Sequence, residues 1–315
     1  MTGGPVGDAE LLTRARGALL GLVAGNQLGV PTEHLGTPEA IRAAFPDGVW
    51  EPTSPPRNSP YDDDAAMTLL LAESLAEKSE FDAADVSARW LMWLKRDGRG
   101  VGQTTRQALR LIDQGVDPFA AGRQVLADLG PRQAAGNGSV MRCVPVALRY
   151  HGSVGKLIRV STQQAAITHA DDRCLWGAAA VNLAVRELLH GNIYFVNEVL
   201  HRIAEQAPRV LVEAIRRVLR EQQVDLPITV AGEAGYVVHC VEIAFWFATH
   251  GRSLEDALVY LAQAGGDTDT NAAVAGALLG ARDGESAIPP TWMPRIAGAA
   301  GIRQLADTLI AAGGA

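Results

Sequence analysis

The chain contains 315 residues, of which 48% are hydrophobic and 20% are charged, a balance typical of a folded globular protein rather than a disordered one. The formal net charge is −7 at pH 7, and no cluster of Lys and Arg forms the basic face of a nucleic-acid-binding protein, so we expect no nucleic-acid partner. No segment has the order of a secretion signal or the roughly 18 to 20 apolar residues that cross a bilayer, and the three cysteines are far apart; we therefore expect a cytoplasmic protein that does not bind membranes.

Glycine is frequent in residues 1–8, and we expect a flexible N-terminus there, followed by a single domain over residues 9–315. Apolar residues at spacings of three and four predict the first helix over residues 9–24. Gly25 should end this helix, because further Gly and Pro residues follow it closely. The segment 45–61 contains five prolines and predicts a long extended surface loop.

Helical patterns occupy most of the remaining chain, and no stretch shows the sustained period-two alternation of a β-strand. There is no internal repeat and no linker that divides the helices into two sets, so the sequence predicts an all-α fold in one domain. The predicted helices span residues 62–78, 83–96, 104–114, 118–129, 141–148, 154–164, 171–190, 195–206, 210–223, 233–249, 253–263, 267–282 and 303–312.

Two groups of carboxylates stand where predicted helices begin. The first is Asp62, Asp63 and Asp64, and the second is Asp267 and Asp269, which head a helix of almost entirely small and apolar residues. Either group could simply cap its helix, because Asp at a helix N-terminus satisfies backbone N–H groups and complements the helix dipole. One capping residue is enough, however, and adjacent carboxylates repel each other unless a cation lies among them. Oxygen ligands without His or Cys favour Mg²⁺ or Mn²⁺ over Zn²⁺.

Three further motifs contain groups that suit ligand binding. Residues 136–142 begin Gly-Asn-Gly, where a backbone can approach a ligand closely and its N–H groups can hold phosphate; the alternative is a turn that starts a helix. Thr168 and His169 precede another predicted helix, and a lone His is more often structural or solvated than functional. Residues 25–33 end in Glu33, which would be an ordinary surface acid if the segment were only a helix end and a loop.

Taken in order, these five motifs resemble the ADP-ribosylglycohydrolase family. The family pattern runs from a helix into Gly-Asp-Ala-Leu-Gly-x-Pro-x-Glu, through Thr-Asp-Asp-Thr-x-Met, Gly-Asn-Gly-x-x-Met-Arg and a Thr-His pair, to Gly-Gly-Asp-Thr-Asp-Thr. The resemblance spans about residues 14–310 and includes a closing segment, Ile-Pro-Pro-Thr-Trp. The matching segments here are residues 25–33, 62–67, 136–142, 168–169, 265–270 and 288–292.

The resemblance implies an all-α hydrolase that cleaves the glycosidic bond between ADP-ribose and an acceptor, with water activated at a site that holds two Mg²⁺ or Mn²⁺ ions. The partner would be an ADP-ribosylated protein or a small molecule that contains ADP-ribose. By position, the implied metal-binding residues are Asp63, Asp64, Asp267, Asp269 and Thr270, and we add Asp62 because it belongs to the same cluster. The implied catalytic residues are Glu33, as a further ligand or as the acid/base group beside the water, and Asp269. The residues implied to contact the substrate are Gly136, Asn137, Gly138, Ser139 and His169.

Three positions depart from the family pattern: Asn26 stands in place of Asp, Asp62 in place of Thr, and Ala65 in place of Thr. Ala65 removes a hydroxyl, Asp62 adds a charge and Asn26 removes one, while the other carboxylates of the pattern are kept. These changes leave two alternatives beside an ADP-ribosyl-protein hydrolase. One is a hydrolase of a small nucleotide or nucleoside N-glycoside, and the other is a catalytically silent scaffold that binds ADP-ribose.

Overall fold

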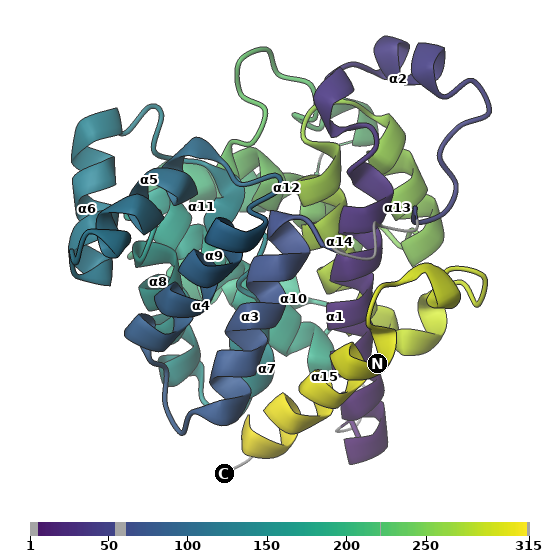
Figure 1. Cartoon of the computed structure of the whole chain (residues 1–315). Helices are drawn as coiled ribbons and strands as arrows, with labels where there is room; N and C mark the ends of the chain where they lie inside the picture. Colours follow the sequence, from purple (N-terminus) through teal and green to yellow (C-terminus); the bar gives the residue numbers. More distant parts are fainter. Residues whose placement is uncertain (1–5, 54–60, 221, 314–315) are drawn as a thin grey trace.

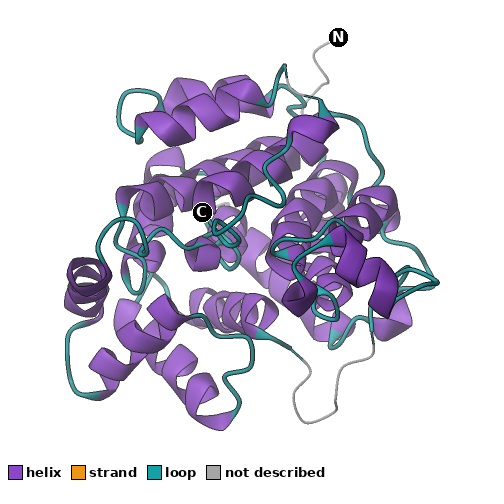
Figure 2. Ribbon diagram, turned by 90° about the horizontal axis from the view of Figure 1, so that it is seen from above, coloured by secondary structure: helices purple, strands orange, loops and turns teal. Residues whose placement is uncertain are grey.

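A computed structural model describes residues 6–53, 61–220 and 222–313, and within these ranges the chain forms fifteen α-helices and no strand (Figures 1 and 2). The all-α prediction is therefore confirmed. Residues 1–5 of the expected flexible N-terminus lie outside the described residues, and Asp8 already belongs to the first helix. The helices are α1 (Asp8–Gly29), α2 (Pro38–Ala44), α3 (Asp63–Glu77), α4 (Ala83–Arg96), α5 (Gln103–Asp113), α6 (Pro118–Leu129), α7 (Val144–Arg149), α8 (Val154–Ala166), α9 (Asp172–Leu189), α10 (Phe195–Ile203), α11 (Arg209–Arg217), α12 (Val237–Thr249), α13 (Leu254–Gln263), α14 (Thr268–Asp283) and α15 (Ala299–Gly313).

At the centre of the fold, α1 and α14 form the most extensive helix–helix contact of the described chain, and α9, α12, α13 and α15 pack around this pair (Figure 1). A stripe of glycines on α1, which we call the glycine stripe, makes this contact possible. A Cβ atom on Gly21 would lie 2.3 Å from the carbonyl oxygen of Gly276, so the two backbones touch without intervening side chains. The stripe consists of Gly17, Gly21, Gly25 and Gly29, which recur every fourth residue and therefore share one face of the helix.

The prediction that the first helix ends at Gly25 was wrong, because α1 continues to Gly29. Glycine costs about 1 kcal/mol relative to alanine in a helix interior, which is why it reads as a stop in a sequence. Here Gly25 and Gly29 are buried packing positions, and the close contact with α14 offsets that cost. After this extra turn, a short connection leads to Glu33, which begins a 3₁₀ helix at Glu33–Leu35.

Other differences from the predicted elements are local. The helix α2 was not predicted; Thr37 caps its first turn by accepting a hydrogen bond from the backbone N–H of Ala40, and Pro38 occupies its first position. Gly235, with φ of +78°, delays the start of α12 by four residues from the predicted start at 233. The predicted loop over 45–61 is described only outside residues 54–60.

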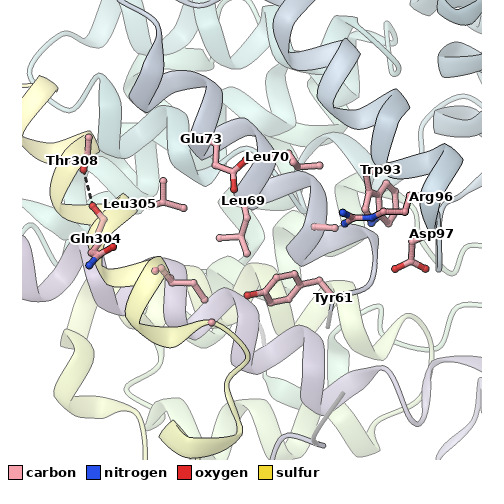
Figure 3. Close-up of a pocket in the computed structure, with 14 residues that line it drawn as sticks. Tyr61, Leu69, Leu70, Glu73, Trp93, Arg96, Asp97, Gln304, Leu305 and Thr308 are labelled. Atoms are coloured by element: carbon pink, nitrogen blue, oxygen red, sulfur yellow. Dashed lines mark hydrogen bonds between the residues drawn. The ribbon is translucent and has the colours of Figure 1, made fainter. Parts of the chain in front are cut away.

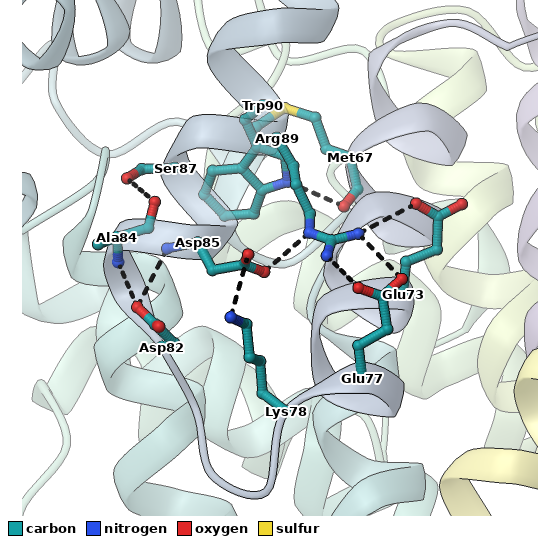
Figure 4. A network of polar contacts seen from close by, with 10 residues as sticks. All are labelled: Met67, Glu73, Glu77, Lys78, Asp82, Ala84, Asp85, Ser87, Arg89 and Trp90. Carbon is teal, nitrogen blue, oxygen red and sulfur yellow. Dashed lines mark hydrogen bonds and ion pairs between the residues drawn. The ribbon is translucent and has the colours of Figure 1, made fainter.

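The orientation of α3 matters because the first carboxylate cluster stands at its start. Arg89 on α4 reaches α3 through Glu77, with 2.5 Å between Nη2 and Oε2, and through Glu73, with 3.5 Å between Nη1 and Oε2 (Figure 4). The ring nitrogen of Trp90 donates to the carbonyl oxygen of Met67 at 3.0 Å, deeper in the same interface. The two helices are thus joined by an ionic network at one end and a buried hydrogen bond nearer the site.

The structure also shows whether any described helix could cross a membrane and where the three cysteines lie. Within the part of the chain that the structure describes, no helix is both long and apolar enough to pass through a membrane. Cys143, Cys174 and Cys240 are buried and free. Burial raises the pKa of the Cys240 thiol well above its usual value, so it is not a reactive thiolate.

Candidate active site

Segments from across the sequence meet at one cavity of about 250 Å³. It lies where the end of α1 and the starts of α3 and α14 approach each other, and the loop before α5 and the turn before α7 complete its walls. The lining residues are Glu33, Asp63, Asp64, Gly100, Gly102, Gln103, Thr104, Thr105, Gly136, Asn137, Gly138, Met141, His169, Asp267, Asp269 and Thr270.

Helix capping explains only part of the two carboxylate clusters. Asp267 does cap α14, because its side chain accepts a hydrogen bond from the backbone N–H of Thr270 at 3.4 Å. Asp62 stands at the N-cap position of α3, yet its side chain makes no capping hydrogen bond. Its carboxylate instead accepts a hydrogen bond from Nδ2 of Asn26 at 3.3 Å. The capping alternative therefore does not account for the first cluster.

The carboxylates of the two clusters form one continuous group through Asp62. Oxygen atoms of Glu33, Asp62 and Asp269 lie within 4.8 Å of one another. Oxygen atoms of Asp62, Asp63 and Asp64 satisfy the same distance. Five carboxylates from three separate segments thus present oxygen atoms to a common space, as a site for divalent cations requires.

Burial makes this arrangement costly without a cation. Desolvation raises the pKa of Asp63, Asp64 and Asp269 well above the usual value for Asp, and the neighbouring carboxylates raise these pKa values further. Glu33 is exposed as a residue, but its carboxylate faces the cluster; desolvation, followed by the charges of Asp62 and Asp267, raises its pKa to about 7. The group attracts positive charge strongly.

Unsatisfied oxygen atoms provide a direct test of whether the cluster suits metal ions. Oδ1 of Asp64 and Oδ1 of Asp269 are buried, and neither has a hydrogen-bond partner in the described part of the chain. Buried polar atoms are normally paired, because an unpaired one loses its contact with water without compensation. A cation between the clusters would supply partners for both atoms, so the residues fit a hard divalent ion.

Sequence reasoning missed the loop that closes the cavity over α3. Gly100 has φ of +77°, and a Cβ atom on it would lie 2.5 Å from Oδ1 of Asp63 and 2.8 Å from Oδ2 of Asp62. Only glycine therefore fits without displacing the carboxylates. The available signal was the spacing Gly-x-Gly-x-Gly over residues 98–102, directly between two predicted helices.

The Gly-Asn-Gly segment also lines the cavity. The backbone N–H of Asn137 is already used, since it donates to the carbonyl oxygen of Gly235 at 2.8 Å. Its side chain donates to Oδ2 of Asp267 at 2.7 Å and so orients that carboxylate. Ser139 does not line the cavity; it is fully buried, and its hydroxyl donates to the carbonyl oxygen of Cys174 at 3.2 Å.

His169 lies against the same glycines and also lines the cavity. Its side chain is almost completely buried, and desolvation, assisted by the charge of Arg142, lowers its pKa to about 3. A Cβ atom on Gly138 would lie 2.7 Å from Cε1 of the ring. The glycine at 138 is therefore required by the histidine, in addition to any approach of a ligand.

A larger cavity, of about 600 Å³, lies between α3, the end of α4 and α15 (Figure 3). Its walls are largely apolar, with Leu69, Leu70 and Trp93 on one side and Leu305 on the other. Among the sequence-predicted site residues, none lines this cavity. Chemistry rather than volume therefore identifies the smaller acidic cavity as the candidate active site.

Comparison with known proteins gives similarities over almost the whole chain. The model of the ADP-ribosylglycohydrolase family matches residues 7–315. The chain is 30% identical over 305 residues to the ADP-ribosyl-(dinitrogen reductase) glycohydrolase of Rhodospirillum rubrum, which covers 94% of this chain and 92% of that protein. It is 29% identical over 334 residues to the ADP-ribosylhydrolase ARH3 of Bos taurus, which covers 92% of this chain and 90% of that one. A solved structure described as an ADP-ribosylglycohydrolase-related protein complex superposes with a TM-score of 0.78 at 27% identity, covering 97% of this chain and 99% of the other.

Proposed function

The chain belongs to the ADP-ribosylglycohydrolase family and is a hydrolase of glycosidic bonds, and we propose that it releases ADP-ribose from a modified side chain of a protein. The names of two relatives support this substrate class, since one acts on ADP-ribosylated dinitrogen reductase and the other is an ADP-ribosylhydrolase. The observation that carries the proposal is the joined carboxylate group around Asp62, with its buried and unpaired oxygen atoms, in a cavity that also contains His169.

We propose that this group holds two Mg²⁺ or Mn²⁺ ions. The oxygen donors would come from both helix starts and from the short 3₁₀ helix that follows α1, and all of them are hard ligands. When bound, such ions orient ribose hydroxyls and lower the pKa of a coordinated water. The residues proposed to hold them are Asp62, Asp63, Asp64, Asp267, Asp269 and Thr270, with Glu33 beside them.

Glu33 is proposed as the general base that takes the proton of the attacking water. Desolvation and the charges of Asp62 and Asp267 raise the pKa of its carboxyl to about 7 without cations. Bound cations would lower this pKa, so that Glu33 would be ionised and able to accept a proton. It lies at the exposed end of the cluster, so water can reach it. Asp269 shares the cluster with Glu33 and is proposed to orient the reacting groups from the buried side.

The remaining lining groups are proposed to bind the substrate. Asn137 holds Asp267 in place while lining the cavity, and the glycines on either side of it leave room for the ring of His169 beside a bound sugar. A small glycoside is the second candidate substrate, because the cavity volume of about 250 Å³ suits a ribosyl group better than a whole ADP-ribose. For a protein substrate, the rest of the ADP-ribose would extend toward the opening.

The proposal is tested by measuring release of ADP-ribose from an ADP-ribosylated protein and of the free base from small ribosides. We expect release from the protein with Mg²⁺ or Mn²⁺, its loss with EDTA and its recovery when metal is returned. Glu33→Gln should abolish release, whereas Glu39→Gln, an exposed glutamate on α2, should not change it. Turnover of ribosides alone would favour the second candidate, and metal-independent turnover would contradict the proposed site.

A further inference from the structure

Arg142 is a buried cation that has no ionic partner among the residues the structure describes. It is fully buried, and its guanidinium lies 4.1 Å from the centroid of the Trp90 ring. Its Nε donates to Oε1 of Gln164 at 3.2 Å, and among the described residues no carboxylate forms an ion pair with it. Burying an unpaired charge is costly, so the groups that accept hydrogen bonds from Arg142 stabilise it in the core.

Arg142 begins a chain of hydrogen bonds that leads to the active site. Its Nη2 donates to Oγ1 of Thr168 at 2.7 Å, and Oγ1 lies 2.8 Å from Nδ1 of His169. Arginine has donors but no acceptor, so the threonine hydroxyl cannot donate back to it. Thr168 is fully buried and its hydroxyl proton needs an acceptor nearby. Nδ1 of His169 is that acceptor.

The direction of this chain determines which nitrogen of His169 carries the hydrogen. The ring is neutral, because burial keeps its pKa at about 3, and a neutral imidazole has one N–H group. If Nδ1 accepts from Thr168, the hydrogen lies on Nε2. Nε2 faces the glycine turn, 3.1 Å from where a Cβ of Gly138 would be and 3.3 Å from where one of Gly136 would be. Among the described residues it has no hydrogen-bond partner, and the ring borders the cavity.

We propose that Arg142 and Thr168 are positioning residues that fix His169 as the Nε2–H tautomer, so that the ring donates a hydrogen bond to an oxygen atom of the bound substrate. His169 then binds the substrate as a donor and takes no proton in the reaction, which leaves that role to Glu33. The identity of the substrate rests on the proposed function, with ribose or diphosphate oxygens as the acceptors. The tautomer itself follows from the hydrogen-bond chain alone.

The tautomer is tested first, by NMR of the full chain labelled with ¹⁵N-histidine, with His169→Asn to assign its signals. We expect a protonated Nε2 and an unprotonated Nδ1 in the unmodified protein and in Thr168→Ser, which keeps the hydroxyl. Thr168→Val removes the hydroxyl and should mix the tautomers. Thr162→Val, in helix α8 before Thr168 and away from the cavity, is the control. A hydrogen on Nδ1 in the unmodified protein, or an unchanged tautomer in Thr168→Val, would overturn the proposal.

Binding of ADP-ribose, measured by calorimetry with Mg²⁺, then tests the consequence for the substrate. Loss of one neutral hydrogen bond weakens binding about tenfold, and we expect this for His169→Ala and most of it for Thr168→Val. If Thr168 acts through His169, the double variant should bind no more weakly than His169→Ala. Additive losses would contradict that role. If the unmodified protein does not bind ADP-ribose, the proposed function fails, while the NMR result still decides the hydrogen-bond chain.

Discussion

Nδ2 of Asn26 donates a hydrogen bond to Oδ1 of Asp62 at 3.3 Å, and this contact joins the last turns of α1 to the start of α3. In the family pattern quoted above, these two positions hold Asp and Thr. The present chain has the carboxylate on the other partner, so the pair still contains one carboxylate and one neutral group. Two of the three departures from the pattern thus meet in a single buried contact, where we expect them to compensate each other.

A double substitution tests this compensation. Asn26→Asp alone places two buried carboxylates against each other and removes the donor, so we expect it to lower the free energy of unfolding of the metal-free protein by about 1 to 3 kcal/mol. Adding Asp62→Thr should recover most of this loss, since a threonine hydroxyl can donate to the new carboxylate. Denaturant titration in the presence of EDTA measures the free energy of unfolding of the single and the double variant. Simple addition of the two single effects would show that the positions are independent.

Gly100 provides a test of the loop that closes over α3. We expect Gly100→Ala to weaken Mn²⁺ binding by roughly tenfold or more, because its Cβ would displace the carboxylates of Asp62 and Asp63. Gly115→Ala is the matched control: Gly115 has φ of +90° but open space around it, so both variants carry the strain of left-handed backbone, about 1 to 2 kcal/mol. Calorimetric titration with Mn²⁺ separates the two effects. Equal affinities in the two variants would refute the role given to Gly100.

His169 makes stability depend on pH. Its pKa is lowered from 6.5 to about 3 by burial, so below pH 6.5 the unfolded chain binds a proton that the folded protein excludes. Its contribution is therefore fully present above pH 6.5 and is lost as pH falls, by about 2 kcal/mol at pH 5. His169→Asn should flatten the fall in unfolding free energy between pH 6.5 and 5, whereas the exposed His201→Asn should not. The same slope in both variants would exclude His169 as the cause.

The ionic network on α4 is expected to stabilise the fold without affecting the chemistry. Arg89→Met leaves Asp85, Glu73 and Glu77 close together without their shared cation, and we expect a loss of about 1 to 2 kcal/mol. Arg96→Met, at the exposed end of the same helix, should cost less than half of that. Thermal unfolding at low and high salt gives the comparison. If added salt did not reduce the difference in thermal stability between Arg89→Met and Arg96→Met, the stabilisation by the network would not be electrostatic in origin.

Local signals were sufficient for much of the fold. The predictions for α4 and α6 matched their bounds, because Asp82 and Asp117 cap these helices with their side chains and apolar residues recur at helical spacing. The end of α1 was mispredicted because the cause of its continuation is α14, a partner more than two hundred residues away in sequence. A single domain over residues 9–315 and a cytoplasmic location stay predictions.

Some residues of the candidate site were also predictable from local sequence signals, and others were not. The five motifs predicted from sequence do contribute to one cavity, although Ser139 faces away from it and Asp62 joins the cluster without lining the cavity wall. Gly100 and the partners of His169 were not found, because their importance depends on contacts between segments that no local pattern records. Gly100 lies beside Asp62 and Asp63, which the sequence did identify. Arg142 and Thr168 lead by hydrogen bonds to His169, which it also identified.

The glycine stripe has a consequence for motion as well as for packing. A Cβ on Gly29 would lie 2.3 Å from the Cα of Asp269, so backbone meets backbone beside the carboxylates. No layer of side chains separates the two backbones there, so their close packing resists sliding of α1 against α14 and holds the end of α1 beside Asp269. Room for a bulky substrate therefore has to come from the other walls of the cavity, which include the glycine-rich loop at 98–102.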